Sequence, residues 1–179
     1  MAGLEDLYKE IILDHYRNPR NRGELEAPPA QRAEGFNPLC GDEVVVYLDL
    51  DATNGSGDDA IVRDIKISGQ GCSISQSSAS MMSQSVKGKT AAEARKLLRS
   101  FEHLMSIHSK NLGTDEAEDV ADLDEAELGF DPADPTKGLG DLAALQGVVK
   151  YPVRIKCATL GWYTLRQGLD DAAAGILSQ

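Results

Sequence analysis

Apolar and polar residues recur along the first seventy positions with a helical period and then with an extended one. Residues 3–17 place apolar side chains three and four positions apart, which predicts an amphipathic helix that ends at Asn18-Pro19. The stretch 18–39 is rich in proline and glycine and predicts irregular chain with one short strand at Gln31–Phe36. Glu43–Leu50 and Ile61–Ile67 alternate with a period of two, and Ile61, Ile65 and Ile67 are expected on one side.

The second half of the chain has a helical pattern. Ser73–Val86 predicts a helix of small residues that ends before Gly88, and Thr90 with Glu93 forms a capping box for the next helix. A short helix is expected around residues 139–149, and Pro152 opens a last helix that runs towards Ala174. Strands followed by helices indicate an α+β fold, in which helices pack on one face of a small antiparallel sheet of about three strands.

Size and charge narrow the class of protein. The 179 residues suit one domain, predicted to cover residues 1–179, and no apolar run approaches the ~20 residues of a membrane span. The net charge of −11 argues against nucleic acid as a partner. Ten of the acids lie between Thr114 and Thr136 without a Lys or Arg, which predicts a mobile acidic insertion at about 110–138. The amino-terminal residues lack the pattern of a secretory signal, so we expect a cytoplasmic protein.

The cysteines are the first candidates for chemistry. There are three, Cys40, Cys72 and Cys157, and an odd number without a secretory signal argues against a disulfide framework. Three unrelated buried thiols are one interpretation of this count. The other is a metal site, because Cys72 is expected at a helix start that favours a thiolate, and Asp42 adds a carboxylate. Three sulfurs and one oxygen would complete a tetrahedral zinc site.

The sequence motifs around these cysteines resemble those of a known family. Tyr8, followed by the motifs IILDHYRNPRNRG (residues 11–23), NPLCGD (37–42), GQGCSIS (69–75), ASMM (79–82) and YPVRIKCATL (151–160), occurs in this order. Together these motifs resemble the SufU-type branch of the NifU/IscU-like iron–sulfur cluster assembly proteins. The resemblance covers nearly the whole chain and implies an IscU/SufU-like fold.

The resemblance implies Cys40, Asp42, Cys72 and Cys157 as the metal ligands and zinc as the metal, with iron or an iron–sulfur cluster as the alternative. Cluster scaffolds of the wider family carry a histidine immediately before the third cysteine, where this chain has Lys156. SufU-type members also carry an insertion between the second and third cysteines, which fits the 85 positions found here. Both features favour the zinc-bound sulfur acceptor.

By the same resemblance, the partner is a cysteine desulfurase of the SufS type, which uses pyridoxal phosphate to form a persulfide. A histidine of that partner replaces Cys40 at the zinc, and the released thiolate takes the terminal sulfur. Asp42, Cys72 and Cys157 keep the metal in place, and a downstream iron–sulfur scaffold complex receives the sulfur. Arg154, three residues before Cys157, is the candidate cation beside the anionic site.

Two other functions fit parts of this pattern. One is a scaffold on which an iron–sulfur cluster is assembled and handed to apo-proteins, with Asp42 as a labile ligand. The other is a purely structural zinc domain. Among the remaining polar residues, His15 lies on the apolar stripe of the first helix and is expected to be packed, and the serines of residues 73–85 are expected to allow close helix packing.

Overall fold

The computed structural model describes residues 3–111, 134 and 136–175. Its elements follow one another as α1 (Leu4–Arg17), β1 (Gln31–Asn37), β2 (Asp42–Asp51), the 3-10 helix η1 (Gly57–Asp59), β3 (Ile61–Gln70), α2 (Ser73–Val86), α3 (Ala91–Asn111), the 3-10 helix η3 (Gly140–Lys150) and α4 (Pro152–Ala173). Most of the predicted acidic insertion at 110–138 lies outside the described residues. The extent of the single domain, residues 1–179, stays a prediction.

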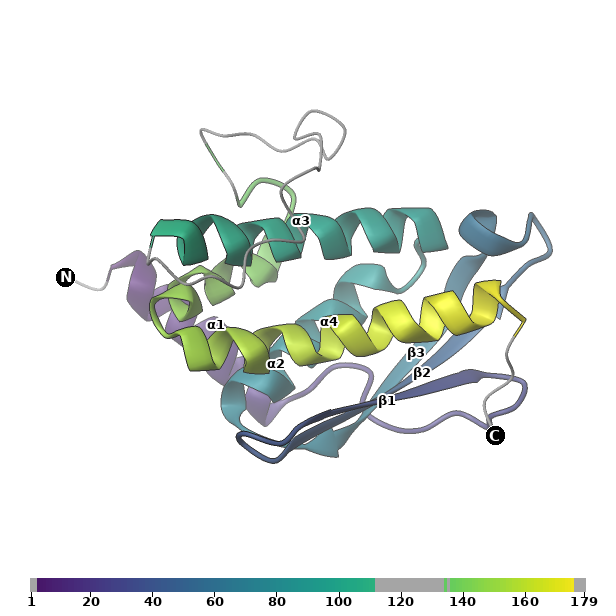
Figure 1. Cartoon of the computed structure of the whole chain (residues 1–179), viewed down its shortest axis with the longest axis horizontal. Coiled ribbons are helices and arrows are strands. Elements are labelled where there is room, and N and C mark those ends of the chain that lie inside the picture. Colours follow the sequence, from purple (N-terminus) through teal and green to yellow (C-terminus); the bar gives the residue numbers. More distant parts are fainter. Residues whose placement is uncertain (1–2, 112–133, 135, 176–179) are drawn as a thin grey trace.

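The three strands form one antiparallel sheet in the order β1-β2-β3. Val46 of β2 lies opposite Ala33 of β1 and opposite Ile67 of β3, so the central strand pairs on both sides. The helices lie on one side of this sheet, where α4 crosses β1 and β2 (Figure 1). The predicted α+β fold is therefore confirmed. None of the helices in the described part has the length and apolar character needed to span a bilayer.

Close contact between α4 and the sheet depends on Gly35 of β1. A Cβ atom at Gly35 would overlap Thr164 Oγ1 and lie 3.1 Å from Leu160 Cδ1, so only glycine fits beneath the helix. The core above the sheet includes Trp162 of α4, which is fully buried and stacks on Phe101 of α3 with 4.9 Å between ring centroids. This packing fixes the start of α4 beside the loop that joins β1 to β2.

One local prediction needs correction, and another is confirmed with its helix type now defined. Ile61 is expected on one side of β3 with Ile65 and Ile67, but Val62 is buried together with Ile65 and Ile67, and Ile61 is only half-buried. A shift of register between Asp49 and Leu50 moves the buried position by one residue. The short helix expected at 139–149 is a 3-10 helix, whose three-residue turn places Leu142, Leu145 and Val148 on one buried face.

The serine-rich helix α2 is buried along most of its length. Ser78 donates a hydrogen bond of 2.5 Å to the carbonyl of Ala158 in α4, and Gly161 faces Ala79 so closely that a Cβ atom would lie 3.3 Å from the alanine methyl. The small side chains thus allow two helices to touch, as the sequence predicted.

Candidate metal site

Cys40 lies on the loop that joins β1 to β2. Asn37 and Asp42 are the last paired residues of the two strands, which leaves four residues to reverse the chain. Asn37 closes this loop, because its carbonyl accepts from Gly41 N–H at 2.8 Å and its Oδ1 accepts from Leu39 N–H at 3.1 Å. Gly41 has a φ of 72°, which glycine adopts without strain. Cys40 is exposed at the tip of this loop.

Cys72 and Cys157 come from two helices. Cys72 is the N-cap residue of α2, and its Sγ accepts from Ser75 N–H at 3.5 Å, as expected for a thiol at a helix start. Cys157 lies in the second turn of α4 and is buried. Its Sγ is 3.5 Å from the Sγ of Cys40, although 117 positions separate the two residues.

Asp42 connects these thiols. Its side chain is 1% exposed, and its Oδ1 accepts from Cys72 N–H at 2.9 Å. Its Oδ2 lies 3.0 Å from Cys40 Sγ and 3.6 Å from Cys72 Sγ. The carboxylate occupies the space beside Gly71, where a Cβ atom would lie 2.5 Å from Asp42 Oδ1. Glycine at position 71 is therefore needed for this arrangement, which sequence reasoning did not recognise.

The electrostatics of the group follow from its burial. Burial acts to raise the pKa of Asp42, but hydrogen bonds from Cys40, from Cys72 N–H and from the other two thiols outweigh it and hold the pKa below its usual value. For the Cys157 thiol, burial raises the pKa strongly, and contacts with Cys40, Asp42 and Cys72 raise it further. Without a metal, the group therefore pairs one carboxylate with a thiol that keeps its proton.

The donor set fits a metal ion. Ligand atoms of Cys40, Asp42 and Cys157 all lie within 4.8 Å of one another, and Cys72 Sγ joins them through Asp42. Ligands of a tetrahedral zinc ion with Zn–S bonds of ~2.3 Å stand about 3.8 Å apart, close to the 3.5 Å between the sulfurs of Cys40 and Cys157. Three thiolates and one carboxylate suit zinc, and thiolates also suit iron.

Comparison with known proteins gives the family. Residues 7–125 match the NifU-like N terminal domain. The chain is 40% identical to the zinc-dependent sulfurtransferase SufU of Bacillus subtilis over 174 residues, covering 97% of both chains. It is 31% identical to the iron–sulfur cluster assembly scaffold protein IscU of Streptococcus pyogenes, over 97% of this chain and 89% of that one. The chain belongs to the SufU-type branch of the NifU/IscU-like family.

A solved structure agrees with this family membership. It comes from Fervidobacterium islandicum and is described as a candidate iron–sulfur cluster assembly scaffold protein for the SUF system. It superimposes with a TM-score of 0.64 and 32% identity, covering 93% of this chain and 99% of that chain. The predicted IscU/SufU-like fold is therefore confirmed, and the protein is one of the iron–sulfur cluster assembly proteins.

The other predicted site residue, Arg154, is exposed on the first turn of α4, three positions before the buried Cys157. Lys156, at the position where cluster scaffolds of the family carry histidine, is also exposed. The structure thus brings the four predicted ligands together and leaves Arg154 at the rim of the same helix end. Their assignment as ligands, and that of Arg154 as a supporting cation, remain predictions.

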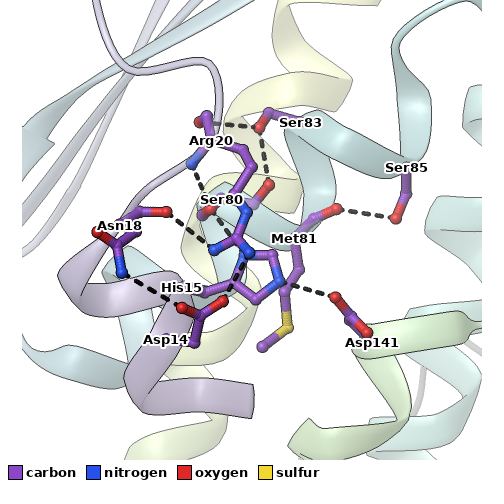
Figure 2. A network of polar contacts seen from close by, with 9 residues as sticks. All are labelled: Asp14, His15, Asn18, Arg20, Ser80, Met81, Ser83, Ser85 and Asp141. Carbon is purple, nitrogen blue, oxygen red and sulfur yellow. Dashed lines mark hydrogen bonds and ion pairs between the residues drawn. The ribbon is translucent and has the colours of Figure 1, made fainter.

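His15 is a packed residue, as expected, and lies outside the metal site. It is 1% exposed, with Nδ1 2.8 Å from Ser80 Oγ and Nε2 2.9 Å from Asp141 Oδ2 (Figure 2). Ser80 Oγ already accepts from Arg20 N–H at 2.8 Å, so its own proton is free to go to Nδ1 and the Nε2 proton to Asp141. The network joins α1 and η3 to α2, the helix whose N-cap is Cys72.

Proposed function

We propose that this protein is a zinc-bound sulfur acceptor that takes persulfide sulfur from a cysteine desulfurase at Cys40. The observation that carries this proposal is the unequal exposure of the three cysteines around one carboxylate. Cys40 is exposed on a loop, Cys72 is half-buried at a helix start, and Cys157 is buried in a helix. The name of the Bacillus subtilis relative, a zinc-dependent sulfurtransferase, supports it.

Cys40, Asp42, Cys72 and Cys157 would hold the zinc. When bound, zinc keeps thiolates deprotonated at neutral pH without redox chemistry of its own. Asp42 is fixed by the Cys72 N–H, Cys72 by its place at the start of α2, and Cys157 by the packing of α4. Cys40 is the side chain of the four that can move outwards without disturbing the core. A histidine of the sulfur donor, taking the place that Cys40 leaves, would keep four ligands.

The chemical step is a thiol–persulfide exchange. The Cys40 thiolate attacks the terminal sulfur of the persulfide on the donor's cysteine, a new S–S bond forms on Cys40, and the donor's own S–S bond breaks. The donor cysteine leaves as a thiolate, and the terminal sulfur keeps its proton. Atoms and electrons balance without an added oxidant or reductant.

The surface around Cys40 supports approach by a protein. Leu39, on the same loop as Cys40, is 70% exposed, and Phe36, near the end of β1, is 60% exposed. Val153, whose carbonyl lies 3.8 Å from Cys157 Sγ, is 64% exposed. Exposed apolar side chains beside a reactive group are typical of a docking surface. We therefore place the desulfurase over this end of the sheet, with a downstream iron–sulfur scaffold complex as the receiver. Three unpaired cysteines favour a cytoplasmic setting.

The first experiment measures turnover of the cognate desulfurase with this protein in three states: zinc-loaded, stripped by a chelator, and reloaded with zinc. We expect strong stimulation by the loaded form, loss on stripping and recovery on reloading. No stimulation by the loaded form would contradict a sulfur acceptor. It would favour the cluster scaffold, which is checked by adding iron and sulfide and following the visible absorption of a cluster.

Arg154 gives a smaller prediction. Three thiolates and a carboxylate around Zn²⁺ leave a net charge of about −2, which a cation at the start of α4 stabilises. Because Arg154 is exposed, solvent screens its charge, so Arg154→Ala is expected to weaken zinc binding only modestly, by about two- to fivefold. Competition with a chromophoric chelator measures this, with Arg63→Ala as a control on the sheet. Unchanged zinc affinity and sulfur acceptance would make Arg154 an ordinary surface residue.

A further inference from the structure

The segment that follows α1, residues 18–23, is attached along α2 by hydrogen bonds to two buried serines. Arg20 N–H donates to Ser80 Oγ at 2.8 Å, and Asn21 Nδ2 donates to Ser83 Oγ at 3.1 Å. Ser83 Oγ donates to the Ser80 carbonyl at 2.7 Å and also lies 3.3 Å from the Arg20 carbonyl, as Figure 2 shows together with the His15 contacts. The motif DHYRNPRN thus fixes the course of the chain along α2, and none of its residues is among the proposed metal ligands.

The same segment continues onto the edge of β3. The N–H of Ile67 donates to the Asn21 carbonyl at 2.9 Å, and the N–H of Gly23 donates to the Ile67 carbonyl at 3.1 Å. Arg22 lies between these two bonds. Its Nη2 donates to the Gly69 carbonyl at 2.7 Å, and its Nη1 donates to Gln76 Oε1 at 2.9 Å.

Gly69 and Gln76 stand on the two sides of Cys72, three positions before it in β3 and four after it in α2. We propose that Arg22 is a positioning residue that clamps the turn between β3 and α2 and thereby holds Cys72 at the metal site. One planar guanidinium binds both arms of the turn. The proposal rests on the proposed function for the identity of the metal, although the clamp itself is a property of the chain.

Three features make this clamp specific. Gln76 is buried, and among the described residues its Nε2 has no hydrogen-bond partner. Its Oε1 accepts the bond from Arg22, so this bond satisfies the oxygen of the buried side-chain amide. The backbone N–H of Gln76 donates to the Cys72 carbonyl at 3.1 Å, which ties Gln76 directly to the cysteine. Lysine at position 22 would keep the charge but lack the fork that reaches two acceptors at once.

The test uses Arg22→Ala and Arg22→Lys, with Arg63→Ala as the matched control. Arg63 is also an exposed arginine of this sheet region with two hydrogen bonds, both to Asp49, at 2.8 and 2.9 Å. Two quantities are measured: zinc affinity by chelator competition, and the alkylation rate of each cysteine in the metal-free protein by mass spectrometry.

We expect Arg22→Ala to lower zinc affinity about tenfold, the range of a lost outer contact to a metal ligand. In the metal-free protein Cys72 should be alkylated several-fold faster, with Cys40 and Cys157 unchanged. Arg22→Lys should show most of the effect of Arg22→Ala, because lysine lacks the fork, and Arg63→Ala should match the wild type. An unchanged Cys72 rate in Arg22→Ala, or an equal rise at all three cysteines, would overturn the clamp.

The alkylation measurement also separates this proposal from the proposed function. It is made without zinc and without a desulfurase, so the clamp can hold even if the zinc-loaded protein stimulates no desulfurase. Should Arg22→Ala fail to fold, the comparison of Arg22→Lys with the wild type still decides, because lysine keeps the charge and the solvent-exposed stem.

Discussion

Cys40→Ala is expected to reduce desulfurase stimulation to the level without this protein and to abolish the persulfide on this chain, while the fold stays intact. Cys40 is exposed at a loop tip, so its removal leaves no cavity and should change the free energy of unfolding by only about 0.5 kcal/mol. The measurements are desulfurase turnover, the mass of the protein after reaction, and the thermal midpoint by circular dichroism.

The comparison for Cys40→Ala is Cys157→Ala. Cys157 is buried beside Asp42 and Cys40, so its removal should weaken both zinc binding and thermal stability. Both variants are assayed at saturating zinc, because loss of any ligand lowers metal affinity. If Cys40→Ala still gained a sulfur, mapped to Cys72 or Cys157, the acceptor would be one of those residues and the assignment of Cys40 would be wrong.

Gly71→Ala is expected to have the second largest effect, a fall in zinc affinity of about 100-fold. The added Cβ would lie 2.5 Å from Asp42 Oδ1 and 2.6 Å from Ser75 Oγ, so the carboxylate must leave its place between Cys40 and Cys72. Overpacking of this kind should also cost about 1–3 kcal/mol of folding stability in the metal-free protein. Chelator competition and thermal unfolding measure the two effects.

Gly147→Ala is the matched control for Gly71→Ala. Gly147 lies in η3, is exposed, and a Cβ atom there would have no heavy atom within 4 Å. We expect unchanged zinc affinity and a thermal midpoint equal to or slightly above the wild type. Wild-type zinc affinity in Gly71→Ala would show that the Asp42 carboxylate does not occupy this place when the metal is bound.

The sequence by itself determined most of the secondary structure and the class of fold. Apolar spacing predicted α1, and Pro152 predicted the start of α4. The capping box at Thr90 is present, with Glu93 N–H donating to Thr90 Oγ1 at 3.1 Å and Thr90 N–H to the Glu93 carboxylate at 2.9 Å. These features depend on neighbours within one or two turns, so a local pattern is sufficient to predict them. The motifs around the cysteines, through their resemblance to a family, also named four ligands.

Only the tertiary structure decided how those residues meet. The spacing of Cys40 and Cys157 along the chain does not say that their sulfurs lie 3.5 Å apart, because that distance results from the packing of α4 over Gly35. The bulge that buries Val62 and the clamp formed by Arg22 depend in the same way on pairing between distant segments. Local sequence encodes which side chains prefer burial or a helix start, whereas contacts between distant segments are fixed when several elements pack at once.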